Sequence, residues 1–293
     1  MNRRQIFAAA AVGAANAAPA AAQPRRRRRV QIETRDGVQL FHRETGDGAP
    51  LLFIAGWALP SDVWAYQTVA LAEQGFRCIA YDRRGHGRSD DPGRGYDYDT
   101  LADDLAAVLD QLDLENVTLV GHSMASGEMV RCMTRHGGAR VAKLIFVAPA
   151  ATPCLTQYID PAVFEASRRD KLMRDFPKAL REGLPPFFTP DSSPALQDWV
   201  FEMMLRTSHS AVVGCNRALT GADFRADLPR IAAPSLVLHG TRDVSAPIDI
   251  TGRPTATAIP GAELKIYEDA PHGLFLTHTE RVNADITTFA RQT

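Results

Sequence analysis

The sequence lacks the features that mark a metal-binding, redox or nucleic-acid-binding protein. Only four cysteines occur in 293 residues, and no pair of them has the CxxC spacing of a zinc or redox site. The formal net charge is -1, so no overall basic field is available to hold nucleic acid. We therefore expect no metal site and no nucleic-acid partner, and a small molecule as the ligand.

The amino-terminal apolar run has little Leu, Ile or Val, which argues against a retained membrane anchor. The pair Arg3-Arg4 precedes an alanine-rich stretch that ends near Ala22. Paired arginines before such a stretch are typical of a twin-arginine export signal. We expect residues 1–22 to be removed during export to the periplasm. Residues 23–29 would then form a basic leader, with no stable membrane span in the mature chain.

Export would permit disulfide bonds, but the positions of the cysteines favour free thiols. Cys78 lies in an apolar strand-like run and Cys132 in a helix-like one, where a free cysteine behaves as a small hydrophobic residue. No connectivity between these two and the remaining Cys154 and Cys215 can be read from their spacing.

Short apolar runs that alternate with helix-like stretches make up most of the remaining chain. This pattern is typical of strands buried on both faces, and it predicts a mostly parallel, doubly wound α/β sheet. The expected strands are Leu51–Ile54, Cys78–Tyr81, Val117–Val120, Leu144–Val147, Leu236–His239 and Leu264–Tyr267. The expected helices are Thr100–Leu112, Gly127–His136 and Thr279–Ala290. An amino-terminal hairpin is predicted to turn at Asp36-Gly37.

The alternation stops after Pro149, and the segment that follows is helix-like and punctuated by proline. We interpret residues 153–228 as a helical cap inserted into the α/β core. The core itself would consist of residues 30–152 and 229–293, because strand and helix signals resume near Pro234.

Ser123 lies where a predicted strand meets the next helix, in the sequence Gly121-His-Ser-Met-Ala125. This arrangement is a variant of the G-x-S-x-G nucleophile elbow, in which a strained turn lifts the serine hydroxyl above the strand end. The small side chain of Ala125 replaces the second glycine of the pattern. We predict that Ser123 is a nucleophile.

A serine hydroxyl attacks efficiently only when a base takes its proton and a third group orients that base. His272 follows the last predicted strand and precedes the last helix, so it is the predicted base. Asp243 follows another strand and is the predicted orienting acid; Asp269 is the rival, but it lies only three residues before His272. The order Ser, Asp, His is the one used by the α/β-hydrolase fold.

Attack on an ester creates an oxyanion that needs fixed hydrogen-bond donors. The predicted donors are the backbone amides of Met124 and Trp57, with Gly56 allowing the chain to turn before Trp57. Aromatic side chains are expected to line a pocket for an uncharged, apolar substrate. The candidate pocket residues are Trp57, Phe187, Phe188, Trp199 and Phe275.

With these residues in place, the chain resembles the cofactor-free bacterial haloperoxidases, a group of α/β-hydrolases. The resemblance runs nearly end to end and is carried by Gly56-Trp57, Ala80–Ser89, Tyr96–Leu105, Gly121–Met124, Pro247–Asp249, Ala262–Tyr267, Ala270–Gly273, Thr277-His278 and Val282–Asp285. It implies a serine esterase for small aryl or short-chain esters that needs no cofactor. It also leaves open a perhydrolase or haloperoxidase side activity.

The sequence departs from the pattern of this group at a few positions beside the predicted site. Ala55, Ala125 and Thr241 stand where His, Gly and Asp are common. Residues 150–200 match least, so substrate selectivity is expected to reside in the cap. Ala58 lies where members of the group vary and where the choice between water and peroxide is set.

Other interpretations of the sequence fit less well. A dehalogenase would need a carboxylate at the elbow, where Ser123 stands. The segment Gly85–Asp90 follows a strand, as a dinucleotide-binding loop does, but it lacks the third glycine. A non-catalytic ligand-binding protein would need no base, whereas all three triad residues are present. A lactonase stays as an alternative, because the sequence does not rank lactones against aryl esters.

Overall fold

The computed structural model describes residues 31–153 and 160–292. The predicted export signal (1–22), the basic leader (23–29) and Cys154 therefore lie outside the described residues. The other three cysteines, Cys78, Cys132 and Cys215, are buried free thiols. Across the described ranges, no helix combines the length and the apolar character that crossing a bilayer would require.

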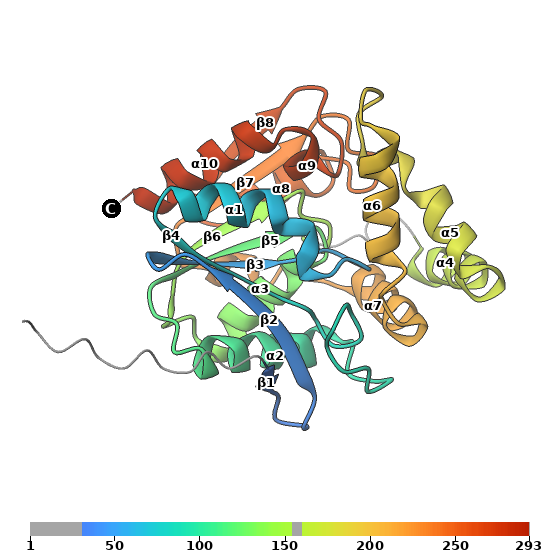
Figure 1. The fold of residues 1–293 in the computed structure, drawn as a ribbon, viewed down its shortest axis with the longest axis horizontal. Helices are drawn as coiled ribbons and strands as arrows, with labels where there is room; N and C mark the ends of the chain where they lie inside the picture. Colours follow the sequence, from blue (N-terminus) through green and yellow to red (C-terminus); the bar gives the residue numbers. More distant parts are fainter. Residues whose placement is uncertain (1–30, 154–159, 293) are drawn as a thin grey trace, which may run out of the picture.

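An eight-stranded sheet with the strand order β1-β2-β4-β3-β5-β6-β7-β8 forms the centre of the fold (Figure 1). β1 pairs with β2, and β2 with β4, in antiparallel orientation, whereas all later neighbours are parallel. This confirms the predicted α/β class. The strands are β1 (Gln31–Glu33), β2 (Gln39–Thr45), β3 (Ala49–Ile54), β4 (Phe76–Tyr81), β5 (Val117–His122), β6 (Val141–Val147), β7 (Ser235–Gly240) and β8 (Glu263–Tyr267).

The sheet is buried on both faces because its central strands carry apolar side chains at successive positions. In β3, Leu52 and Ile54 belong to one core cluster, whereas Leu51 and Phe53 belong to the other. This division follows from the strand, which points successive side chains to opposite faces. It explains why the strands read as unbroken apolar runs.

Helices cover both faces of the sheet (Figure 1). α1 and α10 pack on one face and contact each other, and α2 and α3 pack together on the other. The helices of the α/β core are α1 (Ala65–Glu73), α2 (Tyr98–Gln111), α3 (Ala125–His136), α8 (Gly252–Ala258), α9 (Leu274–Thr277) and α10 (Thr279–Arg291), with the 3-10 helices η1 (Ser61–Trp64) and η4 (Leu228–Arg230).

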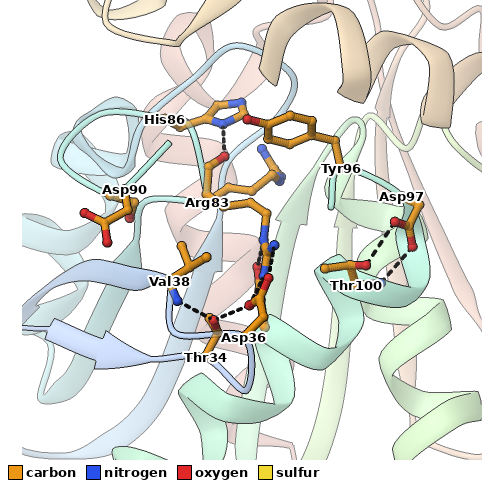
Figure 2. Close-up of polar contacts among 12 residues, drawn as sticks. Thr34, Asp36, Val38, Arg83, His86, Asp90, Tyr96, Asp97 and Thr100 are labelled. Atoms are coloured by element: carbon orange, nitrogen blue, oxygen red, sulfur yellow. Dashed lines mark hydrogen bonds and ion pairs between the residues drawn. The ribbon is translucent and has the colours of Figure 1, made fainter. Parts of the chain in front are cut away.

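The turn between β1 and β2 is tied to the loop after β4 and to α2 (Figure 2). Asp36 accepts a hydrogen bond from Thr34 Oγ1 at 2.6 Å and pairs with both terminal nitrogens of the Arg84 guanidinium at 3.0 and 2.9 Å. Arg84 also pairs with Asp104 of α2, with its Nε 2.7 Å from a carboxylate oxygen. One guanidinium thus links three segments that are distant in sequence.

Four α-helices lie between β6 and β7 in the part of this segment that the structure describes, which we interpret as a cap. They are α4 (Pro161–Arg174), α5 (Phe176–Gly183), α6 (Pro194–Met204) and α7 (His209–Gly221), with the 3-10 helix η3 (Pro185–Phe187). Asp160, Asp175, Ser193 and Ser208 cap the four helices by accepting hydrogen bonds from first-turn amides. Their capping oxygens, together with proline early in α4, α5 and α6, explain where these helices begin.

Candidate active site

Ser123 occupies a sharp turn between β5 and α3. Its φ of 54° lies in the left-handed region, which costs a non-glycine residue on the order of 1 kcal/mol. The turn is held in place because the Ser123 amide donates to Val147 O at 2.9 Å and the Ser123 carbonyl accepts from Ser126 Oγ at 2.7 Å. These bonds fix the backbone that carries the predicted nucleophile.

Two glycines leave room for this turn. A Cβ at Gly121 would lie 2.7 Å from Met129 Sδ and 3.2 Å from Ala125 Cβ. A Cβ at Gly56 would lie 2.5 Å from His122 Nδ1 and 3.2 Å from Ser123 Cβ. The end of β3 can therefore pass close to the elbow only because Gly56 has no side chain.

The structure brings the three predicted triad residues together at the carboxyl ends of the strands. His272 Nε2 lies 2.9 Å from Ser123 Oγ, and His272 Nδ1 lies 2.7 Å from Asp243 Oδ2. All three side chains are buried, and Ser123 and His272 still reach a cavity. A base hydrogen-bonded to the hydroxyl on one side and to a carboxylate on the other is the arrangement that activates a serine.

The Asp243 carboxylate is held ionised in a buried position. Its other oxygen accepts hydrogen bonds from the amides of Ser245 and Ala246 at 2.9 and 2.7 Å. Burial by itself raises the pKa of Asp243, but the imidazoles of His272 and His239 outweigh it and hold that pKa well below its usual range. Sequence reasoning treated His239 only as a strand end, yet its Nε2 lies 3.3 Å from Asp243 Oδ2.

The rival acid is engaged elsewhere. The Asp269 carboxylate pairs with Arg242 Nε at 2.8 Å, and its side chain is 73% exposed. Asp243 is therefore the acid that contacts His272 in this structure.

His122, the residue before Ser123, packs beneath the base. Its Nε2 lies 3.1 Å from the backbone oxygen of His272, and the two imidazole rings are 4.7 Å apart. Burial, with the nearby His272, lowers the pKa of His122 well below its usual value, so the ring is neutral near pH 7. A neutral His122 donates from Nε2 and so supports the loop that carries His272.

The predicted oxyanion donors belong to the two segments that meet at the elbow. Met124 directly follows Ser123 at the start of α3, and Trp57 follows Gly56 at the end of β3. The turn after Gly56 closes with a bond from the Leu59 amide to Gly56 O at 3.3 Å, and Ala58 has a φ of 59°. A positive φ at the third residue is typical of a type II turn.

A cavity of about 360 Å³ opens onto Ser123 and His272. Trp57 and Phe187 line it, as predicted, together with aliphatic side chains of the α4 and α5 region such as Leu172 and Leu180. A volume of this size fits a small ester.

Three of the five predicted pocket residues, Phe188, Trp199 and Phe275, do not line this cavity. Phe275 packs behind the site, 4.8 Å from the ring of His122. Trp199 packs against Tyr66 at 5.9 Å, and Phe188 against Phe187 at 5.4 Å. The aromatic composition of the cap therefore serves packing as much as substrate contact.

The cavity wall also carries charged side chains that the sequence did not single out. Arg168 and Lys171 of α4 and Glu182 of α5 line it. The Arg168 guanidinium lies 4.7 Å from the centre of the Trp57 ring, and burial lowers the pKa of Arg168. No motif marks such residues, because their position depends on how the cap folds over the core.

Among the residues that the structure describes, no group of three or more His, Cys, Asp or Glu side chains is arranged to hold a metal ion.

Comparison with known proteins places this geometry in a family. A model of the alpha/beta hydrolase fold family matches residues 49–279. A non-heme chloroperoxidase of Kitasatospora aureofaciens is 38% identical over 270 residues, covering 87% of this chain and 97% of that protein. A bifunctional esterase/perhydrolase of Acinetobacter calcoaceticus is 31% identical over 274 residues, covering 89% and 99%.

Solved structures agree with the sequence relatives. An esterase from Exiguobacterium antarcticum superimposes with a TM-score of 0.86 at 30% identity, covering 90% of this chain and 99% of that one. The likeness thus includes both the α/β core and the region of the inserted helices.

Proposed function

Because this chain belongs to the α/β-hydrolase family, in the group that contains non-heme haloperoxidases and esterases, we propose that it hydrolyses carboxylic esters through an acyl-enzyme on Ser123. The observation that carries the proposal is the continuous hydrogen-bonded chain from Ser123 through His272 to Asp243, which opens into a small cavity. Family membership alone would not fix this chemistry.

In the acylation step, His272 Nε2 removes the proton of Ser123 as Oγ attacks the ester carbonyl carbon. The carbonyl oxygen becomes an oxyanion, which the amides of Trp57 and Met124 would stabilise. His272 then gives its proton to the departing alkoxide, the carbon–oxygen bond breaks, and the alcohol leaves. Asp243 keeps Nδ1 protonated and stabilises the transient imidazolium.

In the deacylation step, His272 removes a proton from water as the water oxygen attacks the acyl carbon. The same amides stabilise the second oxyanion. Collapse of this intermediate breaks the bond to Ser123 Oγ, which regains its proton from His272, and the carboxylic acid is released.

The cavity supports a small substrate whose reacting end is uncharged, such as an aryl or short-chain ester. Its apolar walls near the elbow, including Trp57 and Phe187, would favour the apolar acyl or alcohol part of such an ester. A lactone undergoes the same two steps and is therefore an alternative substrate class.

Hydrogen peroxide is a second acceptor for the acyl group. The observation that favours it is the similarity to a bifunctional esterase/perhydrolase over nearly the whole chain. Attack of peroxide in place of water would release a peracid, with the same proton transfer to His272.

The test compares turnover of p-nitrophenyl acetate and butyrate by the mature chain and by Ser123→Ala. Removal of the nucleophile is expected to lower turnover on the order of a million-fold, down to background. Equal rates in the two proteins would contradict the proposal. Peroxide is then added to the active protein, and peracid formation is measured.

The first residues support a further proposal, which rests on sequence alone. The Arg3-Arg4 pair and the alanine-rich stretch that follows favour export by the twin-arginine route and a periplasmic location. Fractionation of cells that express the chain with Arg3 and Arg4 replaced by lysine tests it, because export by this route requires the arginines.

A further inference from the structure

Arg83, in the loop after β4, is buried beside the predicted oxyanion hole without lining the cavity. Its side chain is 2% exposed, and it pairs with Glu128, whose side chain is 0% exposed. The Arg83 Nε lies 2.6 Å from Glu128 Oε1, and Arg83 Nη2 contacts the same carboxylate. Glu128 belongs to the first turn of α3, the helix that begins just after Ser123.

The remaining donors of the same guanidinium reach the end of β3. Nη2 donates to the carbonyl of Ala55 at 2.7 Å, and Nη1 donates to the carbonyl of Gly56 at 3.3 Å. Arg83 therefore contacts, with one planar group, both α3 and the end of β3 that leads into Trp57. Figure 2 shows the place of Arg83 in the loop after β4.

The bond to Gly56 matters because of the geometry of the peptide group. The carbonyl of Gly56 and the amide of Trp57 belong to one planar trans unit, in which C=O and N–H point in opposite directions. A donor that fixes the carbonyl on one side therefore fixes where the Trp57 N–H points on the other. A Cβ at Gly56 would lie 3.2 Å from Ser123 Cβ, so this peptide passes close to the reacting serine.

We propose that Arg83 is a positioning residue for the oxyanion hole. It orients the Gly56–Trp57 peptide and ties it to α3 through Glu128, so that the Trp57 and Met124 amides keep a fixed separation. This proposal rests on the proposed serine hydrolase function. It assigns a role to a residue that contacts neither the substrate nor the triad.

The guanidinium is specifically suited to this role. Its donors lie in a rigid plane, so it can bind a carboxylate and two carbonyls at once. A lysine would keep the charge beside Glu128 but has a single nitrogen, which cannot hold all three acceptors in the same geometry. Arg83→Lys therefore keeps the ion pair with Glu128 but loses the fixed orientation of the Gly56–Trp57 peptide.

The experiment measures kcat, KM and the affinity for an alkylboronic acid in Arg83→Lys and in the double variant Arg83→Met with Glu128→Leu. A boronic acid forms a tetrahedral, anionic adduct with a serine hydroxyl and so reports on the oxyanion hole without turnover. The double variant removes both charges together, so it leaves no unpaired charge in the interior. It keeps the test usable if Arg83→Lys folds poorly.

Arg84 supplies the matched control. It is the next residue, is equally buried, and pairs with Asp104 and Asp36. Its guanidinium bonds to these two acids, and within the described ranges none of its hydrogen bonds reaches β3 or α3. Arg84→Lys and Arg84→Met with Asp104→Leu therefore reproduce the loss of a buried arginine pair from the same loop.

We expect kcat to fall about 10- to 100-fold in both Arg83 variants, with KM little changed and boronic acid affinity reduced in the same proportion. The Arg84 variants should keep kcat and boronic acid affinity even where their melting temperature falls. Wild-type kcat and boronic acid affinity in the Arg83 variants, or equal losses in the Arg84 variants, would overturn the proposal. If the wild type binds the boronic acid but turns over no ester, the proposed function fails while the Arg83 comparison still stands.

Discussion

The tautomer of one imidazole decides whether Ser123 can be activated. His272 Nδ1 must carry a proton for Nε2 to accept one from Ser123, and the only carboxylate that contacts His272 among the described residues is that of Asp243. His239 and two backbone amides hold this carboxylate in turn. The reactivity of the serine therefore depends on groups that never touch the substrate.

The first prediction concerns Asp243→Asn. The amide is nearly isosteric, but it can present its NH₂ group to His272 and so favour the tautomer that cannot accept the serine proton. We expect kcat to fall on the order of ten-thousand-fold for p-nitrophenyl butyrate, with the fold retained. Asp269→Asn, which alters only an exposed pair with Arg242, is the control and should keep wild-type kcat. Comparable losses in both variants would contradict the assignment.

Among individual residues, the sequence predicted those that lie in a motif with a strand or helix beside it. Ser123, His272 and Asp243 were found in this way, because strand ends in a parallel sheet meet at one edge. Arg83 and His239 were not assigned a role, although Arg83 lies in a recognisable motif. Its contacts with Ala55 and Gly56 depend on the pairing of β3 with β4, which no local pattern reveals.

The helices between β6 and β7 line part of the cavity. α4 and α5 supply most of the cavity wall that does not belong to the core. The prediction from sequence relied on aromatic residues, of which only Trp57 and Phe187 line the cavity. Charged side chains of α4 and α5 also line it, namely Arg168, Lys171 and Glu182.

The second prediction concerns Arg168, which lies over the Trp57 ring in the cavity wall. An ester with a carboxylate at its far end should have a lower KM than its neutral analogue, because a guanidinium can hold a carboxylate by charge-assisted bonds. Arg168→Gln should raise KM for the anionic ester about tenfold and leave the neutral ester nearly unchanged.

Arg169→Gln is the control for this prediction, because Arg169 lies on the same helix but is exposed and does not line the cavity. An equal change in KM for the anionic and the neutral ester in Arg168→Gln would contradict a role of Arg168 in binding the carboxylate.

Global stability in acid depends on how the amino-terminal hairpin is tied to the rest of the molecule. Bonds from Arg84 and Thr34 lower the pKa of Asp36 from 3.8 to about 2. A carboxylate with a lowered folded-state pKa stabilises the fold above its unfolded-state pKa, and this stabilisation is lost as the pH falls toward the folded-state value. For Asp36 the loss falls between about pH 4 and pH 2.

The third prediction is that Asp36→Asn lowers the free energy of unfolding at pH 7 by roughly 1 kcal/mol or less. The value is small because the Asp36 side chain is 38% exposed and solvent screens its pair with Arg84. Urea unfolding at pH 7 and pH 3 measures the difference, which should shrink at pH 3. Glu73→Gln, at an exposed position of α1, is the control. A difference that grows toward pH 3 would contradict the assigned direction.

At the scale of the whole molecule, the sheet was predictable because burial on both faces leaves apolar runs that are readable without a structure. The amino-terminal hairpin at Asp36-Gly37 was confirmed by the antiparallel pair β1 and β2. The course of the chain between β6 and β7 was less predictable in detail, because helix-like patterns do not specify how helices pack. That packing determines which side chains of the cap reach the cavity.

The most direct test of the central claim is to detect the acyl-enzyme. The purified protein is mixed with excess p-nitrophenyl butyrate, quenched in acid within the first turnover, digested and analysed by mass spectrometry. We predict a butyryl group on the peptide that contains Ser123. It should disappear after the ester is consumed and never form in Ser123→Ala. Ester turnover without this adduct, or the same adduct in Ser123→Ala, would contradict a mechanism that proceeds through Ser123.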